Sequence, residues 1–223
     1  MKKKILLQLA APFYLLFGIT NVFSQTINKN ETGQHDGFYY SFWTDGSSGT
    51  ASITLKPEGR YQAKWNNIGN FTGGKGWSKG KEDRIICYSG KFNGGSNGYL
   101  ALYGWTKDSL IEYYVVENYG DWIPPGAVSL GNFESDGSTY NIYKTRRINQ
   151  PSIVGTATFS QFWSVRTTKR TNGIITFKNH VSAWKNKGML LGKTWDYQIM
   201  ETEGYKSSGY SDITVSECSH PGG

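Results

Sequence analysis

Short β-prone runs separated by turn residues constrain the fold of this chain more than any other feature. The runs lie at residues 99–103, 110–116, 139–144, 158–165, 195–200 and 211–215. Turn-forming residues stand between them, as at Asp45-Gly46 and Asp136-Gly137, and 28 of the 223 residues are glycine. Regularly spaced short strands of this kind are typical of a sandwich or barrel of antiparallel strands. We therefore expect an all-β fold.

One segment departs from the strand pattern. Phe177, His180, Val181 and Trp184 recur at the spacing of one helical face, which predicts a single helix. Thr176 is placed to cap its start and Gly188 to end it. We expect the apolar side chains of this face to pack on the sheet, and His180 to be a packing residue with satisfied hydrogen bonds.

The N-terminus has the pattern of a secretory signal. Lys2, Lys3 and Lys4 precede a mostly apolar run at residues 5–19, and small residues follow near Ser24. An uncleaved anchor is the competing interpretation, but the run falls short of about 20 continuous apolar residues. We expect a signal peptide at residues 1–24, an N-terminal lead-in at 25–36, a catalytic domain at 37–217 and a C-terminal tail at 218–223. The mature protein is then secreted, with no membrane partner.

Charge and motif patterns exclude several classes of partner. The chain has 24 Lys and Arg against 17 Asp and Glu, but these basic residues are scattered, whereas nucleic-acid binding usually needs a clustered basic face. Residues 69–75 have the spacing of a phosphate loop, yet Gly76 stands where Ser or Thr would hold magnesium. We expect no nucleic acid, no nucleotide and no partner chain, so the protein is expected to be a monomer.

The cysteines and histidines do not suggest a metal site. The chain has two cysteines and three histidines, all widely separated. Export permits a bond between Cys87 and Cys218, but each could equally be a small buried residue. We expect no metal and no other cofactor.

Two glutamates lie within β-prone, aromatic-rich segments. Glu112 shares a strand face with Tyr114, and Glu203 shares one with Tyr197. An ordinary solvated sheet face is the plain alternative for either residue. Paired carboxyl groups are, however, the apparatus of glycoside hydrolysis, and aromatic rings stack on sugars. The residues therefore indicate a sugar-binding β protein that could be a hydrolase with two catalytic glutamates.

The segments around these glutamates resemble the signatures of glycoside hydrolase family 11, the endo-1,4-β-xylanases. The resemblance covers residues 37–216. It rests on LIEYYVVE at 110–117, EGY at 203–205 with SSG at 207–209, FWTDG at 42–46, WNNIGNF at 65–71, GKGW at 74–77, YGW at 103–105, PSI at 151–153 and QFWSVR at 161–166.

The resemblance implies a fold, an activity and a set of site residues. The fold would be a β-jelly roll of two curved antiparallel sheets with a single α-helix. The enzyme would hydrolyse internal bonds of xylan with retention of configuration, with Glu112 as nucleophile and Glu203 as acid/base. The implied substrate-binding residues are Trp43, Asn70, Tyr103, Tyr114, Arg147, Pro151, Ser152, Ile153, Gln161 and Tyr197. Three of these, Pro151, Ser152 and Ile153, would form the tip of a mobile thumb.

One residue departs from the family pattern. Glu201 stands two residues before Glu203, where the family usually has a small residue. If Glu201 faced the cleft, it would be a third carboxylate that raises the proton affinity of Glu203 further. We favour the alternative, in which a bulge turns Glu201 outward as a surface charge. Asn70 would favour a neutral pH optimum, since Asn at its position accompanies neutral or alkaline optima. The rival interpretations are a non-catalytic carbohydrate-binding jelly roll and a cellulase-like hydrolase of related fold.

Overall fold

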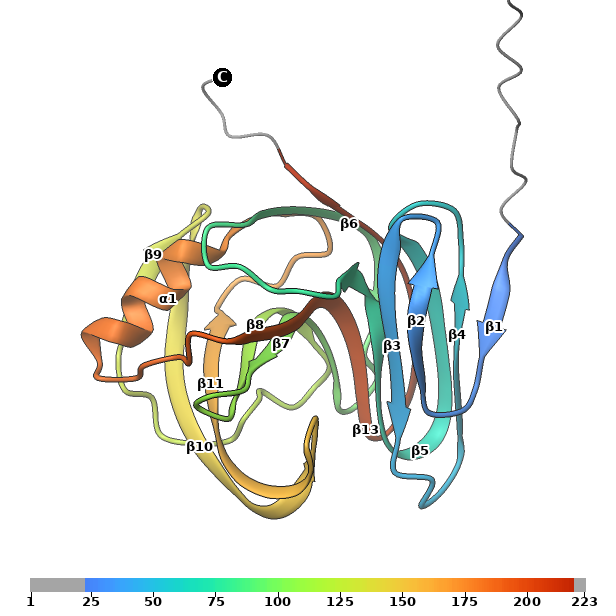
Figure 1. The fold of residues 1–223 in the computed structure, drawn as a ribbon, viewed down its shortest axis with the longest axis horizontal. Coiled ribbons are helices and arrows are strands. Elements are labelled where there is room, and N and C mark those ends of the chain that lie inside the picture. Colours follow the sequence, from blue (N-terminus) through green and yellow to red (C-terminus); the bar gives the residue numbers. More distant parts are fainter. Residues whose placement is uncertain (1–22, 219–223) are drawn as a thin grey trace, which may run out of the picture.

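Thirteen strands and one helix make up residues 23–218, the part of the chain that this computed structural model describes. Most of the predicted signal peptide and residues 219–223 of the predicted tail lie outside it. Figure 1 shows the elements, which are β1 (Gln25–Ile27), β2 (Glu31–His35), β3 (Phe38–Thr44), β4 (Thr50–Leu55), β5 (Arg60–Trp77), β6 (Ile85–Asn93), β7 (Gly98–Thr106), β8 (Ile111–Tyr119), β9 (Asn132–Ser135), β10 (Ser138–Ser152), β11 (Gly155–Arg166), β12 (Gly173–Thr176), α1 (Phe177–Asn186) and β13 (Trp195–Glu217).

Two long strands connect the whole sheet. β13 pairs with β5 along most of its length, while its first half also pairs with β7 and its second half with β6. The main order is β1-β4-β5-β13-β7-β8-β11-β10-β9, and this sheet curves strongly (Figure 1). The predicted all-β jelly roll with one helix is confirmed. Among the described pairs of strands, all are antiparallel except β8 and β11, which run parallel.

Alternate side chains of the central strands enter two separate clusters. Leu100, Leu102, Tyr113 and Val115 lie in the main core, which also receives α1. The intervening residues of β7 and β8 point to the other face of the sheet, as strand periodicity requires. We call this the aromatic face. It carries Tyr99, Ala101, Tyr103, Trp105, Tyr114, Val116, Tyr119, Tyr143, Phe159, Trp163, Val165, Tyr197 and Ile199.

The predicted helix forms and packs as expected, with two differences in detail. Phe177 and Trp184 are fully buried, and Gly188 has a positive φ of 70° just after the helix. Thr176 is the N-cap residue, but its hydroxyl donates to Asp136 Oδ1 at 2.7 Å and does not cap the helix. His180 is fully buried against Tyr140, yet neither ring nitrogen has a hydrogen-bond partner among the described residues. The expectation that His180 is satisfied was wrong, because aromatic rings surround it.

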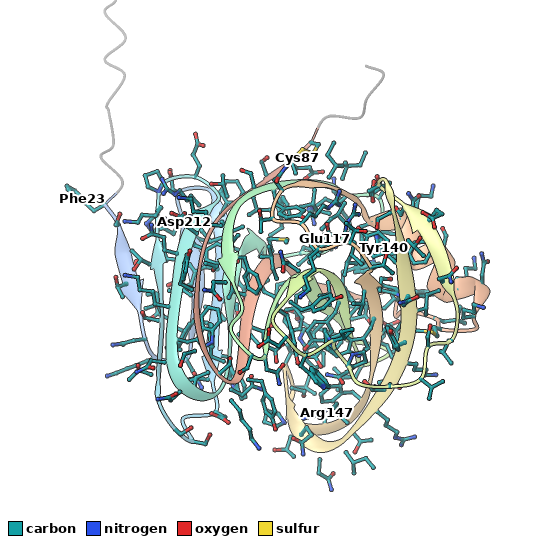
Figure 2. All side chains as sticks on the ribbon, turned by 180° about the vertical axis from the view of Figure 1, so that it is seen from behind. Phe23, Cys87, Glu117, Tyr140, Arg147 and Asp212 are labelled. Carbon is teal, nitrogen blue, oxygen red and sulfur yellow. A yellow bond between two sulfur atoms is a disulfide. The ribbon has the colours of Figure 1, made fainter. Side chains whose placement is uncertain are left out.

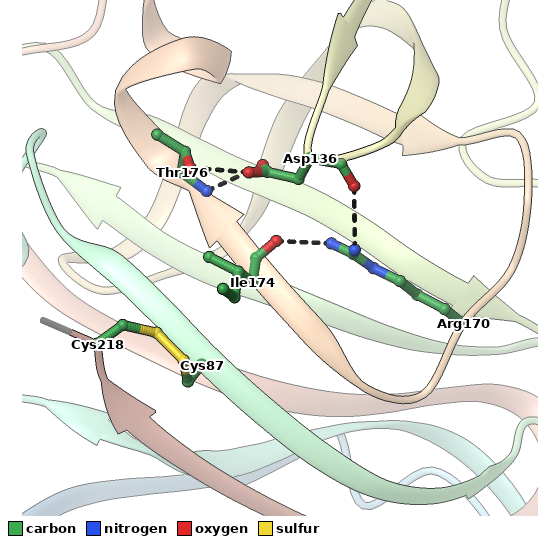
Figure 3. The surroundings of a disulfide bond; sticks show 6 residues. All are labelled: Cys87, Asp136, Arg170, Ile174, Thr176 and Cys218. Carbon is green, nitrogen blue, oxygen red and sulfur yellow. Dashed lines mark hydrogen bonds between the residues drawn. A yellow bond between two sulfur atoms is a disulfide. The ribbon is translucent and has the colours of Figure 1, made fainter. Parts of the chain in front are cut away.

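The sequence left open whether the two cysteines pair, and in the structure they form a disulfide. Cys87 on β6 is bonded to Cys218, which directly follows β13, across 131 residues of chain (Figure 3). The backbone N–H of Cys218 also donates to Ile85 O at 2.9 Å. The bond therefore fixes the end of β13 to the neighbouring strand.

One further expectation can be compared with the structure. Residues 69–76, with the spacing of a phosphate loop, are extended strand within β5, which agrees with the rejection of nucleotide binding. In residues 23–218, no helix is long and apolar enough to cross a membrane.

Candidate active site

Glu112 lies on β8 in a row of paired residues that crosses four strands. Its register neighbours are Trp105 on β7 and Gln161 on β11, and Gln161 in turn lies opposite Thr145 on β10. Residues directly opposite each other in a sheet share a face. The row therefore surrounds the Glu112 carboxyl with polar groups on the aromatic face, where Glu112 is only 6% exposed.

Both oxygens of Glu112 accept a hydrogen bond from a neighbouring side chain. The Tyr103 hydroxyl donates to Oε1 at 2.6 Å, and Gln161 Nε2 donates to Oε2 at 2.6 Å. Each donor is itself held in place. Trp105 Nε1 donates to the Tyr103 hydroxyl, while Thr145 donates to Gln161 Oε1 and so fixes the orientation of the amide.

Glu203 lies on β13 on the same face. It belongs to a row that contains Trp43 on β3, Thr72 on β5 and Tyr99 on β7. Tyr114 stands two residues after Glu112 on β8, and its hydroxyl can donate to either carboxyl group. Figure 1 shows that β13, which carries Glu203, and β8, which carries Glu112, are separated only by β7.

The two carboxyl groups have different proton affinities. Burial raises the pKa of Glu112, but the Tyr103, Gln161 and Tyr114 side chains oppose this rise by hydrogen bonding to the charged form. Burial and the negative charge of Glu112 raise the pKa of Glu203 to about 8, against weaker opposition from Arg147 and Tyr114. Glu112 therefore ionises first, and Glu203 keeps its proton at neutral pH.

Glu201 does not turn outward, so that expectation was wrong. It lies opposite Ala101 on β7 and Gly74 on β5, in unbroken register with Glu203. The irregularities of β13 fall at other positions, between Trp195 and Gln198 and between Ser207 and Gly209. With no bulge between them, residues 201 and 203 share a face. Glu201 is accordingly a third carboxyl on the aromatic face, and it is fully buried.

Several predicted substrate-binding aromatics lie around Glu112 and Glu203. Tyr103 and Tyr114 face each other with ring centroids 4.9 Å apart, and Tyr197 is 5.9 Å from Tyr103. Tyr114 also stacks on Trp163 at 3.8 Å with an interplanar angle of 5°. Trp43, in the Glu203 row, is half-buried and so keeps part of its ring exposed. The structure brings these residues together with the two carboxyl groups.

The hairpin of β10 and β11 carries most of the other predicted residues. Ser152 pairs with Gly155 at its end, so Pro151, Ser152 and Ile153 lie at the tip. Ile153 packs against the aromatic face, and the Ser152 hydroxyl donates to Gly155 O at 2.5 Å. Figure 2 marks Arg147 on the same hairpin, where it is exposed yet lowers the pKa of both Glu112 and Glu203.

Asn70 lies near Glu203 in the sheet, but the side-chain oxygen of Asn70 does not bond to Glu203. It is on β5, two residues before Thr72, which is the register partner of Glu203. Its Oδ1 atom is buried and has no partner among the described residues. The backbone of Asn70 is held by Asp45 and Thr44.

Thr145 is a functional candidate that sequence reasoning missed. A threonine in a strand is unremarkable, and only the register that places it opposite Gln161 reveals its contact. Within residues 23–218, His, Cys, Asp and Glu side chains form no cluster of three or more that could hold a metal ion. The arrangement instead provides two carboxyl groups with separated proton affinities beside aromatic rings.

Comparison with known proteins finds a matching family and several similar enzymes. Residues 35–214 match the profile of the glycosyl hydrolases family 11. The chain is 53% identical over 187 residues to endo-1,4-beta-xylanase 3 of Pyricularia oryzae, covering 83% of this chain and 79% of that protein. It is 52% identical over 194 residues to endo-1,4-beta-xylanase 11A of Botryotinia fuckeliana, covering 86% and 85%. It is also 51% identical over 216 residues to a bifunctional xylanase/xylan deacetylase of Cellvibrio japonicus, covering 92% of this chain and 32% of that protein.

The family match covers most of the chain and includes the strands that carry Glu112, Glu201 and Glu203. Together with the confirmed jelly-roll fold, it shows that this chain belongs to glycosyl hydrolase family 11.

Proposed function

We propose that this protein is a secreted endo-1,4-β-xylanase that cleaves internal bonds of xylan with retention of configuration. Its similarity to endo-1,4-beta-xylanases supports xylan as the substrate. The observation that carries the mechanism is that the two carboxyl groups differ in their hydrogen-bond donors and in their pKa. Glu112 accepts two short hydrogen bonds, whereas burial and the charge of Glu112 keep the proton on Glu203.

In the first half of the reaction, Glu203 begins protonated and Glu112 ionised. Glu112 attacks the anomeric carbon while Glu203 gives its proton to the leaving glycosidic oxygen. The Tyr103 and Gln161 donors hold the Glu112 carboxylate in position and keep it charged in a buried site. The product of this half is a covalent glycosyl-enzyme.

In the second half, the change in charge reverses the role of Glu203. Glu112 is now esterified, so its negative charge no longer raises the pKa of Glu203. Glu203, now ionised, takes a proton from water, and that water cleaves the ester from the same side that the leaving group occupied. Two inversions give net retention.

The surrounding residues would hold the polysaccharide. Trp43 offers a partly exposed ring for stacking, while Tyr114 and Tyr197 offer hydroxyls next to the carboxyl groups. The hairpin tip at Pro151, Ser152 and Ile153 would cover the bound chain. Xylose lacks the exocyclic hydroxymethyl group of glucose, so a close-fitting site would favour xylan over glucan.

Export is part of the same proposal. The predicted signal peptide at residues 1–24 would be removed, and the Cys87–Cys218 bond suits an oxidising compartment. N-terminal sequencing of the protein recovered from culture medium tests this directly. A mature start near Gln25 is expected, and an intact N-terminus on exported protein would contradict it.

Chemical rescue separates the roles of the two glutamates. Glu112→Ala and Glu203→Ala should each lose at least about a thousandfold in activity on xylan, and wild-type enzyme should act far less on carboxymethyl cellulose. With an aryl β-xylobioside, whose phenolate leaves without a proton donor, added azide should restore Glu203→Ala with a β-glycosyl azide product and Glu112→Ala with the α-anomer. Wild-type binding of xylan without cleavage would instead support the non-catalytic binding module.

A further inference from the structure

Glu201 is a buried carboxyl to which the proposed mechanism gives no task. Its side chain is fully buried, and neither of its oxygens has a hydrogen-bond partner among the described residues. Glu203 Oε2 is also buried and without a partner. Buried polar atoms are nearly always hydrogen-bonded, and an unpaired carboxylate is especially costly. Three such oxygens in adjacent positions of one strand face require an explanation.

The neighbouring strands offer Glu201 no donor. Its register partners are Ala101 and Gly74, which have no polar side-chain atoms. Along β13, the flanking residues of the same face are Ile199 and Glu203. Two carboxylates cannot hydrogen-bond to each other, but a carboxylic acid can donate its proton to a carboxylate. The acid proton of one glutamate can therefore supply the hydrogen bond that the other lacks.

The charges around Glu201 decide which glutamate keeps the proton. The charged groups that act on Glu201 are Glu203 and Glu112, which are both acidic. β5 presents only Gly74 and Thr72 toward it, and the remaining titratable groups on this face are tyrosines and one arginine. They are Tyr39 on β3, Tyr99 and Tyr103 on β7, Tyr114 and Tyr119 on β8, Tyr143 and Arg147 on β10 and Tyr197 on β13.

The surroundings stabilise the ionised form of Glu203 more than the ionised form of Glu201. Tyr114 and Arg147 both favour the ionised form of Glu203. For Glu201, burial raises the pKa well above its usual range, and the charges of Glu203 and Glu112 raise it further. When pH rises, Glu203 therefore loses its proton before Glu201 does.

We propose that Glu201 remains a neutral carboxylic acid at the working pH and that its O–H group donates to Glu203. Glu201 is then a positioning residue, which rests on the proposed role of Glu203 as acid/base. The donated hydrogen bond orients the Glu203 carboxyl and stabilises its ionised form in the second half of the reaction, where Glu203 acts as base. It also limits how far burial can raise the proton affinity of Glu203.

Two substitutions of similar size test this hydrogen bond through the pH profile. Glu201→Gln keeps a donor in the same place but cannot ionise, while Glu201→Met removes the donor. Glu201→Met should move the basic limb of kcat/KM upward by about one pH unit, because Glu203 loses a group that stabilises its charged form. Glu201→Gln should leave the limb within a few tenths of a unit of wild type. The exposed Glu82→Gln serves as a control that should move nothing.

Folding stability provides a readout that does not depend on activity. The raised pKa of Glu201 means that its contribution to stability is full below about pH 4 and is lost as pH rises toward its folded-state value. Glu201→Gln lacks this loss, so the Tm of the variant should exceed that of wild type by an amount that grows from pH 4 to pH 9.

The outcomes separate this proposal from the proposed function. An equal shift of the basic limb in the Gln and Met variants, or no shift in the Met variant, would overturn the hydrogen bond while leaving xylan cleavage intact. A pH-independent Tm difference for Glu201→Gln would show that Glu201 is ionised in the folded protein. If wild-type enzyme does not cleave xylan, the proposed function fails, and the Tm series still tests the protonation of Glu201.

Discussion

Glu112 and Gln161 lie directly opposite each other on the parallel strands β8 and β11, and Gln161 Nε2 donates to Glu112 Oε2 at 2.6 Å. This is the parallel pair of a sheet whose other described pairs are antiparallel. The pairing fixes one side of the Glu112 carboxyl through the backbone register of two strands. The Tyr103 hydroxyl from β7 fixes the other side.

The first prediction concerns the amide of Gln161. Gln161→Met removes a donor that lowers the pKa of Glu112, so that pKa should rise and the acid limb of kcat/KM should move to higher pH by about one unit. The rate at the optimum should fall by about 10- to 100-fold, because the carboxylate also loses a positioning contact. A full pH–rate profile measures both effects.

Thr145→Val provides a graded version of the same change. It leaves the Gln161 amide in place but removes the hydroxyl that fixes its orientation. The acid limb should move in the same direction by less than it does in Gln161→Met. If Thr145→Val moves the limb as far as Gln161→Met, or in the opposite direction, the relay from Thr145 to Glu112 does not operate as described.

The second prediction concerns the positive charge on the hairpin. Arg147 lowers the pKa of both Glu112 and Glu203, so Arg147→Met should move both limbs of the pH profile upward. Arg147 is exposed and screened by solvent and ions, which limits the shift to a few tenths of a unit at physiological ionic strength. Arg147→Lys should keep most of the wild-type profile. A shift in Arg147→Met that persists at 1 M salt would contradict an electrostatic origin.

The third prediction concerns a buried acidic residue on the opposite face of β8. Glu117 and Tyr140 are labelled in Figure 2. Glu117 is fully buried, accepts hydrogen bonds from Tyr88 and Tyr140 at 2.5 Å each, and pairs with Arg170. Arg170 also donates to the backbone oxygens of Asp136 and Ile174 (Figure 3). Glu117→Ala should cost about 3–5 kcal/mol, since it leaves a largely buried guanidinium without its charged partner.

Thermal unfolding measures the cost of losing Glu117. For a domain of this size the expected loss corresponds to a fall in Tm of about 10 °C. The activity per folded molecule at 25 °C should stay within about twofold of wild type, because Glu117 lies on the core side of β8. The exposed Glu82→Ala should leave the Tm within about 1 °C. Equal Tm values for the Glu117 and Glu82 variants would show that the cluster does not stabilise the fold.

The fourth prediction concerns the disulfide. Cys87→Ala with Cys218→Ala removes a bond that closes 131 residues of chain, and this should cost about 3 kcal/mol in unfolding free energy. Chemical denaturation in the absence of reductant measures the loss. Reduction of wild-type protein should lower its stability to that of the double variant. A double variant as stable as the oxidised wild type would contradict a stabilising bond.

The strand pattern, the helix and the placement of the two glutamates on strands were predictable because they depend on local periodicity and short motifs. The spacing at residues 177–184 places one helical face, and the alternation in residues 111–116 places Glu112 and Tyr113 on opposite faces. The resemblance to a known family then identified Glu112 and Glu203 as a pair.

The remaining features depend on pairing between distant strands, which local periodicity does not contain. The expected strands at 195–200 and 211–215 are parts of one 23-residue strand, β13, because β5, β6 and β7 pair along it in turn. The contact of Thr145 with Gln161 has the same origin. The orientation of Glu201 was predictable from alternation alone, and the expectation of a bulge at this position led to the wrong answer.

The anomeric form of the first product tests the central claim most directly. Proton NMR of xylohexaose cleavage, recorded within the first minutes before mutarotation, reads the configuration of the newly formed reducing end. The account predicts the β-anomer, since attack by Glu112 and then by water inverts the same carbon twice. Initial release of the α-anomer would show a single displacement and would contradict the role assigned to Glu112.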